Sequence, residues 1–150
     1  MLISSLLMLL LAAGLYGEND DQPKWNTTLF GSYFLVRRGN FGIGGALGYR
    51  FTPRLELEGE IDTIPGEGGV YIMSEGVLYN FDNGTKNTIR YVLGGFSQFI
   101  SQGDITCALM FGGGLKMPLT RSFKIRLDLR LHLFDEGMFA RLSTGLMWTF

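Results

Sequence analysis

Segment 123–133 alternates between apolar and charged residues with a period of two. Phe123, Ile125 and four leucines at the following odd positions share one face of an extended strand. The other face carries Lys124, Arg126, Asp128, Arg130 and His132. An apolar face of this length, opposite a face that is charged throughout, is typical of a strand between lipid and an enclosed polar lumen. A soluble ligand-binding barrel would reverse this arrangement, with its apolar side chains inside, and is the alternative.

The rest of the chain contains further segments with alternating character, separated by turn signals. We predict strands near 26–36, 41–51, 55–64, 70–81, 88–99, 105–117, 123–133 and 138–150. Most of them are as long as a tilted membrane strand requires. Periplasmic turns are expected at 52–54, 82–84 and 118–122, and short outer loops at 37–40, 65–69, 101–104 and 134–137. The sequence thus predicts an all-β fold, a single eight-stranded antiparallel up-and-down transmembrane β-barrel.

The first residues of the chain form an apolar run that is too short for a spanning helix. Residues 1–17 fit a signal peptide, with cleavage sites at Ala12-x-Gly14 or Leu15-x-Gly17. The usual basic residues before such a core are missing, which leaves open a start further upstream; a buried helix is the alternative. Residues 18–24 then form a short polar segment, and 25–150 the barrel.

Composition excludes several functional classes. The 13 basic and 14 acidic residues nearly balance, so no attraction to nucleic acid is expected. Cys107 is the single cysteine, which excludes an intramolecular disulfide and a cysteine-rich zinc site. We interpret it as a small apolar filler that faces lipid. No group of side chains has metal-ligand spacing, and no cofactor is expected.

The hairpin around Pro53 predicts which residues meet in the lumen. With Pro53 at its centre, acidic residues of the third strand lie opposite the smallest residues of the second, and Glu56 lies opposite Arg50. In an eight-stranded barrel the third and seventh strands face each other across a lumen that side chains fill. The predicted luminal charge network contains five acids and five bases: Arg50, Glu56, Glu58, Glu60, Asp62, Lys124, Arg126, Asp128, Arg130 and Arg141.

These charges allow two interpretations. One is an ion path through the barrel, and the other is a salt-bridged plug that holds the barrel rigid. The near balance of charge favours the plug, because an unpaired buried charge costs several kcal/mol. Two strands are less clear. In the first strand, either set of alternate residues could face lipid. In the fourth strand, Glu75 would face lipid unless a bulge near Gly76 turns its side chain away, or unless it lies near the rim of the barrel.

The last strand ends in Ser143, Gly145, Trp148 and Phe150, a spacing that resembles the terminal signal recognised by the barrel-assembly machinery. Together with the glycine-rich segments 91–95 and 112–114, it makes residues 25–150 resemble the outer-membrane β-barrel domain family, the small eight-stranded barrels akin to the OmpA transmembrane domain. The resemblance implies the outer membrane of a Gram-negative bacterium. It also implies a structural or surface-interaction role, since members include structural proteins and adhesins.

Some barrels of this size modify lipid A, and the deacylase type has a histidine and a serine two residues apart. Here the only histidine, His132, is followed two residues later by Phe134 and not by a serine, while Ser143 and Asp128 lie lower on the barrel. We therefore expect no catalysis; a narrow pore is the second hypothesis, and a lipid A-modifying enzyme the third.

Partners are expected to be outer-membrane lipids, lipopolysaccharide and the assembly machinery, with the chain a monomer. Arg37 and Arg38 could contact lipopolysaccharide phosphates. Asp135 and Glu136 could do so through divalent cations. Solvated loops explain both pairs equally well.

Overall fold

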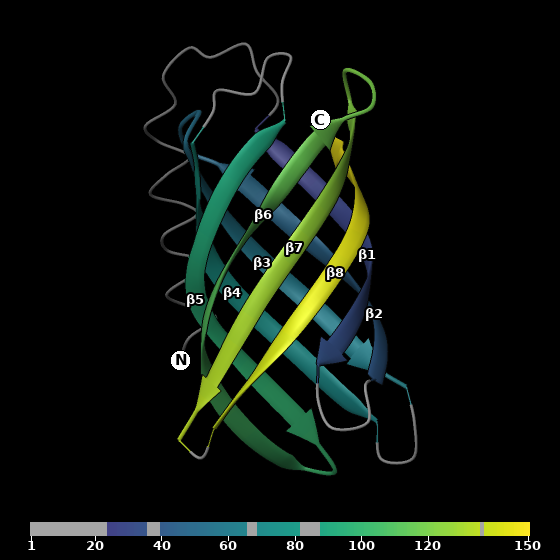
Figure 1. Ribbon diagram of the computed structural model, residues 1–150, viewed down its shortest axis with the longest axis vertical. Helices are drawn as coiled ribbons and strands as arrows, with labels where there is room; N and C mark the ends of the chain where they lie inside the picture. Colours follow the sequence, from purple (N-terminus) through teal and green to yellow (C-terminus); the bar gives the residue numbers. More distant parts are fainter. Residues whose placement is uncertain (1–23, 36–39, 66–68, 82–87, 136) are drawn as a thin grey trace.

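The computed structural model describes residues 24–35, 40–65, 69–81, 88–135 and 137–150. The described residues form eight strands: β1 (Trp25–Leu35), β2 (Asn40–Arg50), β3 (Leu55–Ile64), β4 (Val70–Asn80), β5 (Ile89–Ser101), β6 (Asp104–Pro118), β7 (Phe123–Phe134) and β8 (Gly137–Thr149). Each strand pairs with the next in antiparallel fashion, and β8 closes on β1 (Figure 1). The predicted eight-stranded barrel is therefore confirmed, with every strand boundary within two residues of its predicted place.

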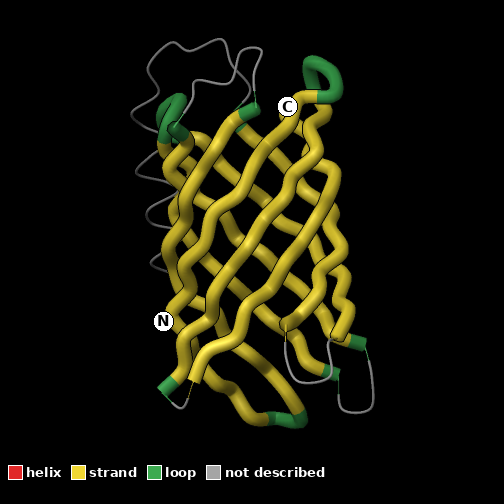
Figure 2. Tube along the Cα trace, in the orientation of Figure 1, coloured by secondary structure: helices red, strands yellow, loops and turns green. Residues whose placement is uncertain are grey.

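Strands make up the wall of the barrel, and the described connections lie at its two ends (Figure 2). No helix in the part of the chain that the structure describes is long and apolar enough to cross a membrane. The predicted signal peptide, residues 1–17, lies outside the described residues, as do Arg37, Arg38, the 82–84 turn and Glu136.

One end of the barrel, here called the termini end, carries two similar turns and both ends of the barrel domain. In each turn a threonine side chain accepts a hydrogen bond from the first residue of the next strand: Leu55 N donates to Thr52 Oγ1 at 3.0 Å, and Phe123 N to Thr120 Oγ1 at 3.1 Å. Trp25 and Phe150 exchange backbone hydrogen bonds beside them. The opposite end, the loop end, carries the connections after β1, β3, β5 and β7.

The β2–β3 hairpin has the register that Pro53 predicts. Arg50 lies opposite Glu56, and Gly44 lies opposite Asp62. This register results from the short turn and from the period of two, because a slip by one residue would move every carboxylate of β3 to the other face.

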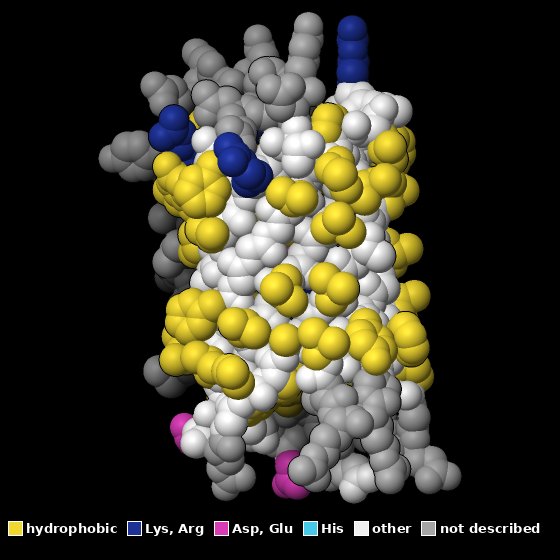
Figure 3. Space-filling view, in the orientation of Figure 1, with side chains coloured by type: hydrophobic (Ala, Val, Ile, Leu, Met, Phe, Trp, Pro, Cys, Tyr) yellow, Lys and Arg dark blue, Asp and Glu magenta, His cyan; other side chains and the backbone are white. Residues whose placement is uncertain are grey.

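The outer wall is apolar. On the face shown in Figure 3, groups of hydrophobic side chains are spread over the wall, while the visible charged side chains lie at the two ends. The odd-numbered leucines of β7 are 38–47% exposed. The structure also decides the phase of β1: Leu29 and Leu35 point outward, whereas Phe30, Ser32 and Phe34 are buried inside.

Glycines leave the space that large luminal side chains occupy. Phe30 pairs with Gly44 on one side and Gly145 on the other. A Cβ atom at Gly44 would come within 2.5 Å of the Phe30 ring, and one at Gly145 within 2.6 Å of the Phe30 Cβ. Gly145, a residue of the predicted assembly signal, therefore also has a packing role beside Phe30.

Neither of the two proposed ways to relieve the exposure of Glu75 occurs. The registers of β4 with β3 and with β5 run without a bulge through Gly76, which pairs with Glu58 and with Gly95. Glu75 points outward and lies four residues from each of two exposed tyrosines, Tyr71 and Tyr79, so it sits midway along the wall and not at the rim.

The β5–β6 hairpin is longer than its neighbours at the loop end. Gln102 and Gly103 form its turn with positive φ angles of 48° and 94°. Because β7 pairs with β6 only from Leu109 onward, the first residues of β6 extend past the end of β7.

Candidate functional site

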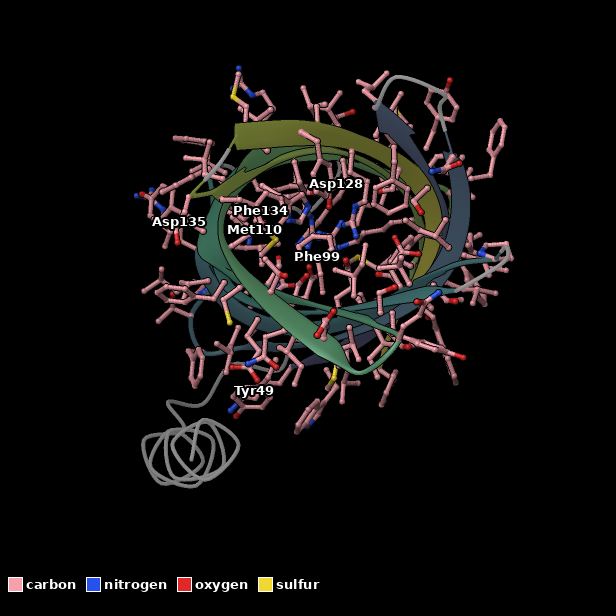
Figure 4. The ribbon with its side chains drawn as sticks, turned by 90° about the horizontal axis from the view of Figure 1, so that it is seen from below. Tyr49, Phe99, Met110, Asp128, Phe134 and Asp135 are labelled. Atoms are coloured by element: carbon pink, nitrogen blue, oxygen red, sulfur yellow. The ribbon has the colours of Figure 1, made fainter. Side chains whose placement is uncertain are left out.

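The lumen holds the candidate site. Side chains at the inward positions of the strands fill it, as the end-on view shows for Met110, Asp128, Phe99 and Phe134, while Tyr49 and Asp135 point away from it (Figure 4). The buried charged side chains are Glu56, Glu58, Glu60, Asp62, Lys116, Arg126, Asp128, Arg130 and Arg141. All but Lys116 belong to the set that the alternation of β3, β7 and β8 predicts.

Nearest the termini end, the carboxylate of Glu56 binds two side chains from different strands. Lys116 Nζ on β6 lies 2.7 Å from Glu56 Oε2, and Asn26 on β1 donates to Glu56 Oε1 at 2.9 Å. Arg50 faces Glu56 in the register, as predicted, and Glu56 also forms a buried ion pair with Lys116, which the sequence did not predict.

The centre of the lumen is organised by two arginines of β7. Both terminal nitrogens of Arg126 contact the Glu58 carboxylate, and Arg126 Nη2 also lies 2.7 Å from Asp128. Arg130 Nη2 lies 2.8 Å from both Glu58 and Asp128. Tyr91 accepts a hydrogen bond of 2.8 Å from Arg126 Nε. Each buried charge here therefore has opposite charges beside it, which offsets the cost of removing it from water.

The network continues toward the loop end through Glu60 and Asp62. Arg130 Nη2 lies 2.9 Å from Glu60, and Arg141 on β8 contacts both Glu60 and Asp62. Ser32 on β1 donates to Asp62 at 2.8 Å. The ion pairs from Glu58 to Asp62 thus form one connected chain along the barrel axis.

Lys124 does not join this chain. It is half-buried near the termini end, close enough to Lys116, Arg50 and Glu56 for their charges to act on it. Among the ion pairs of the described residues none involves Lys124, whereas Lys116 pairs with Glu56.

Aromatic rings cover the network at the loop end. Phe99 of β5 lies 5.0 Å from Phe134, 5.3 Å from Phe139 and 5.4 Å from His132 between ring centroids, and His132 stacks on Phe139 at 4.9 Å. Phe34 contacts Phe139 at 5.9 Å. These five residues are here called the aromatic cap.

The only histidine of the chain belongs to this cap. His132 is fully buried, and neither ring nitrogen has a hydrogen-bond partner among the residues described. Asp128 is occupied by Arg126 and Arg130, and Ser143 lies opposite Asp128. No group of three or more histidine, cysteine or acidic residues in the described ranges could hold a metal ion.

Sequence reasoning missed the luminal roles of Asn26, Ser32, Tyr91 and Lys116. A signal for Lys116 was present, because it shares the inward face of β6 with Gly112 and Gly114. Asn26 and Ser32 were missed because the sequence of β1 does not show which of its faces points into the lumen.

The residues of the predicted assembly signal occupy both faces of β8. Ser143 and Gly145 point into the lumen, whereas Trp148 and Phe150 are about half exposed on the outer wall at the termini end. Cys107 is exposed, on the outward face of β6.

Comparison with solved structures identifies similar barrels. The N-terminal β-barrel domain of Pseudomonas aeruginosa OprF matches with a TM-score of 0.76 at 19% identity, over 86% of this chain and 98% of that one. Neisserial surface protein A gives 0.71 at 13% identity, over 84% and 97%. Ail, the attachment invasion locus protein of Yersinia pestis, gives 0.58 at 14% identity, over 87% and 100%. No protein-family model and no curated protein sequence matches. The chain therefore has the fold of the small eight-stranded outer-membrane barrels.

Proposed function

We propose that the chain is an integral protein of the outer membrane, with a structural or surface-interaction role and a lumen that its own charge network plugs. The observation that carries the proposal is the combination of a connected set of buried ion pairs inside with an apolar wall outside. A soluble barrel would not expose large apolar side chains over its whole wall.

The wall supports a membrane location at both of its ends. Aromatic side chains gather at the termini end, where Trp25 packs on Tyr49 and Phe123 on Trp148. Tyr33 and Phe41 pair similarly at the loop end. Aromatic residues concentrate where a barrel meets the two membrane interfaces. On this orientation the termini end faces the periplasm and the loop end faces outward.

The contents of the lumen favour a plug over a pore. Ion-paired side chains span the lumen from Glu58 to Asp62, and the aromatic cap covers the end of this chain. An ion entering this space would have to displace the salt bridges and part the rings. The buried charges hold the strands together in this proposal, and no catalytic role is assigned to them.

The partners follow from the surface. Trp148 and Phe150 are exposed at the terminal strand, where the assembly machinery could recognise them. The short connections at the loop end would contact lipopolysaccharide. Ail, which shares this fold, is by its name an attachment protein, so the fold is compatible with a surface-interaction role.

Three measurements test the proposal: the location and gel migration of the expressed chain, its conductance in planar bilayers, and the lipid A mass of cells that express it. The chain expressed with its N-terminal segment should enter the outer-membrane fraction and migrate differently before and after boiling. In planar bilayers the purified barrel should show no conductance steps. A periplasmic protein without a migration shift would contradict the membrane location, regular conductance steps would establish the pore, and an altered lipid A mass in cells that express the chain would establish an enzyme.

A further inference from the structure

Exposed charges are separated between the two ends of the barrel. Among the described residues the exposed cations are Arg54, Arg90 and Arg121, and all three lie at the termini end. The exposed acids are Asp104 and Asp135, and both lie at the loop end. Figure 3 shows this separation on one face, with dark-blue side chains at the termini end and magenta side chains at the loop end. In the described part of the chain, the termini end therefore presents positive charge that no exposed acid balances.

Two of these arginines lie on either side of the end of β4. The Asn80 backbone N–H donates to the Arg54 carbonyl oxygen at 2.7 Å, which holds the turn before β3 against one edge of β4. On the other edge, the Phe81 N–H donates to the Arg90 carbonyl oxygen at 2.9 Å. Neighbouring strands lie about 4.8 Å apart, so the two arginine backbones are about 10 Å apart. Their long side chains can therefore approach one anion from two sides.

A tyrosine hydroxyl group lies between the two arginines on the outward face of β4. Arg54 Nη1 donates to Tyr79 Oη at 3.4 Å, and a hydroxyl oxygen that accepts in this way can still donate its own hydrogen. The Tyr79 ring packs edge-on against Phe81, with the ring centroids 5.4 Å apart. Both rings are exposed on the wall. Exposed aromatic rings at a strand end mark the level of the lipid headgroups, so the two arginines lie at the depth of the phosphate groups.

We propose that Arg54, Tyr79 and Arg90 bind the phosphate group of an anionic phospholipid in the periplasmic leaflet. This rests on the membrane location proposed above, which puts the termini end on the periplasmic side. The two guanidinium groups and the tyrosine hydroxyl group are the donors, and guanidinium groups match phosphate oxygens by two-point contact. The acyl chains lie on the apolar wall, along the exposed Val77 and Val92.

The charge of the site favours an anionic lipid over a zwitterionic one. A phosphatidylethanolamine headgroup adds an ammonium group to its phosphate, and a carboxylate beside the arginines would be needed to pair with it. Glu56, two residues after Arg54, points into the lumen, where it pairs with Lys116. Phosphatidylglycerol has the phosphate without the ammonium group, and basic residues near a membrane surface attract such lipids.

Native mass spectrometry of the barrel tests this assignment. The full chain is reconstituted in vesicles of equal parts of phosphatidylglycerol and phosphatidylethanolamine and extracted in mild detergent, and the lipid that it retains is identified by mass. The unchanged barrel should retain phosphatidylglycerol in preference. Arg54→Gln and Arg90→Gln should each reduce the retained fraction about fivefold, the factor that one basic residue near an anionic surface supplies. Tyr79→Phe should reduce it less, because it removes one neutral donor.

Arg121→Gln is the matched control. It removes the same charge from the same end of the barrel, but from the turn between β6 and β7. The retained fraction of phosphatidylglycerol should stay unchanged in this variant. Each variant is first tested for altered gel migration on boiling, which reports a folded barrel.

Three results would overturn the lipid site. The first is equal retention of the two lipids by the unchanged barrel. The second is a preference that the Arg54→Gln, Arg90→Gln double variant leaves intact. The third is an equal loss in Arg121→Gln, which would show attraction by the net charge of this end. The migration test separates these results from a failure of the membrane location, because a barrel that shifts without a lipid preference loses only the lipid site.

Discussion

Arg126 reaches across the barrel from β7 to Glu58 on β3, 68 residues away in the sequence, and both terminal nitrogens of its guanidinium group contact the carboxylate. Two-point contact of this kind fixes the orientation as well as the distance of the pair. The pair joins opposite walls of the barrel directly across the lumen. Backbone hydrogen bonds connect these walls only indirectly, from strand to strand around the barrel.

Removing one partner of this pair should destabilise the barrel strongly. We expect Glu58→Gln and Arg126→Met each to lower the free energy of unfolding by about 3–5 kcal/mol, because each leaves a buried charge with fewer partners. The double variant should lose less than the sum, with a coupling of about 1–3 kcal/mol. Urea titration of the refolded barrel in detergent measures both. Strictly additive losses would show that the two side chains act independently.

The two lysines at the termini end should differ in their contribution. Lys116→Met removes the buried ion pair of Glu56, whereas Lys124→Met changes a half-buried side chain outside the ion-paired chain. We expect the first to cost about 3 kcal/mol or more of unfolding free energy and the second less than about 1 kcal/mol. The same urea titration compares them. Equal losses would mean that Lys124 shares the Glu56 carboxylate in solution.

Gly145 should be required by packing, independently of any role in recognition. A Cβ atom there would lie 2.4 Å from the Leu29 carbonyl oxygen as well as against Phe30, so Gly145→Ala should destabilise the barrel by about 1–3 kcal/mol. Gly94→Ala is the control, because its nearest neighbour would be 3.9 Å away. Refolding into detergent without assembly machinery isolates the packing effect. A Gly145→Ala barrel that unfolds like the unchanged chain would leave recognition as its only role.

Opening the aromatic cap should expose His132 without opening a pore. In the Phe99→Ala, Phe139→Ala double variant, diethylpyrocarbonate should modify His132, the only histidine in the chain, much faster than in the unchanged barrel. The rate of modification is measured from the increase in absorbance of the modified imidazole and is compared between the double variant and the unchanged barrel.

Conductance of the same variant should stay at the background level, because the salt bridges from Glu58 to Asp62 still fill the lumen. Phe96→Ala, on the outer wall, is the control for the loss of an aromatic ring. Conductance steps in the double variant would show that the cap alone closes the barrel.

Much of the fold could be predicted because a strand has a period of two and a membrane barrel has only two environments. The alternation in β7 and β8 identifies the lipid side and the luminal side, and the short turn at Pro53 specifies that Arg50 lies opposite Glu56. The prediction was weak where the alternation is weak. β1 has small and aromatic residues on both faces, so its sequence does not tell which face points into the lumen. That choice was made only when β1 closed the barrel between β2 and β8.

The sequence by itself determined which side chains enter the lumen from β3, β7 and β8 and that their charges nearly cancel. Only the tertiary structure decided which cation meets which carboxylate. Long side chains that cross a narrow lumen can each reach several partners, so the choice depends on how far the strands are staggered when the barrel closes. That stagger brought Lys116 to Glu56, and it placed Gly59 and Phe96 on either side of Glu75.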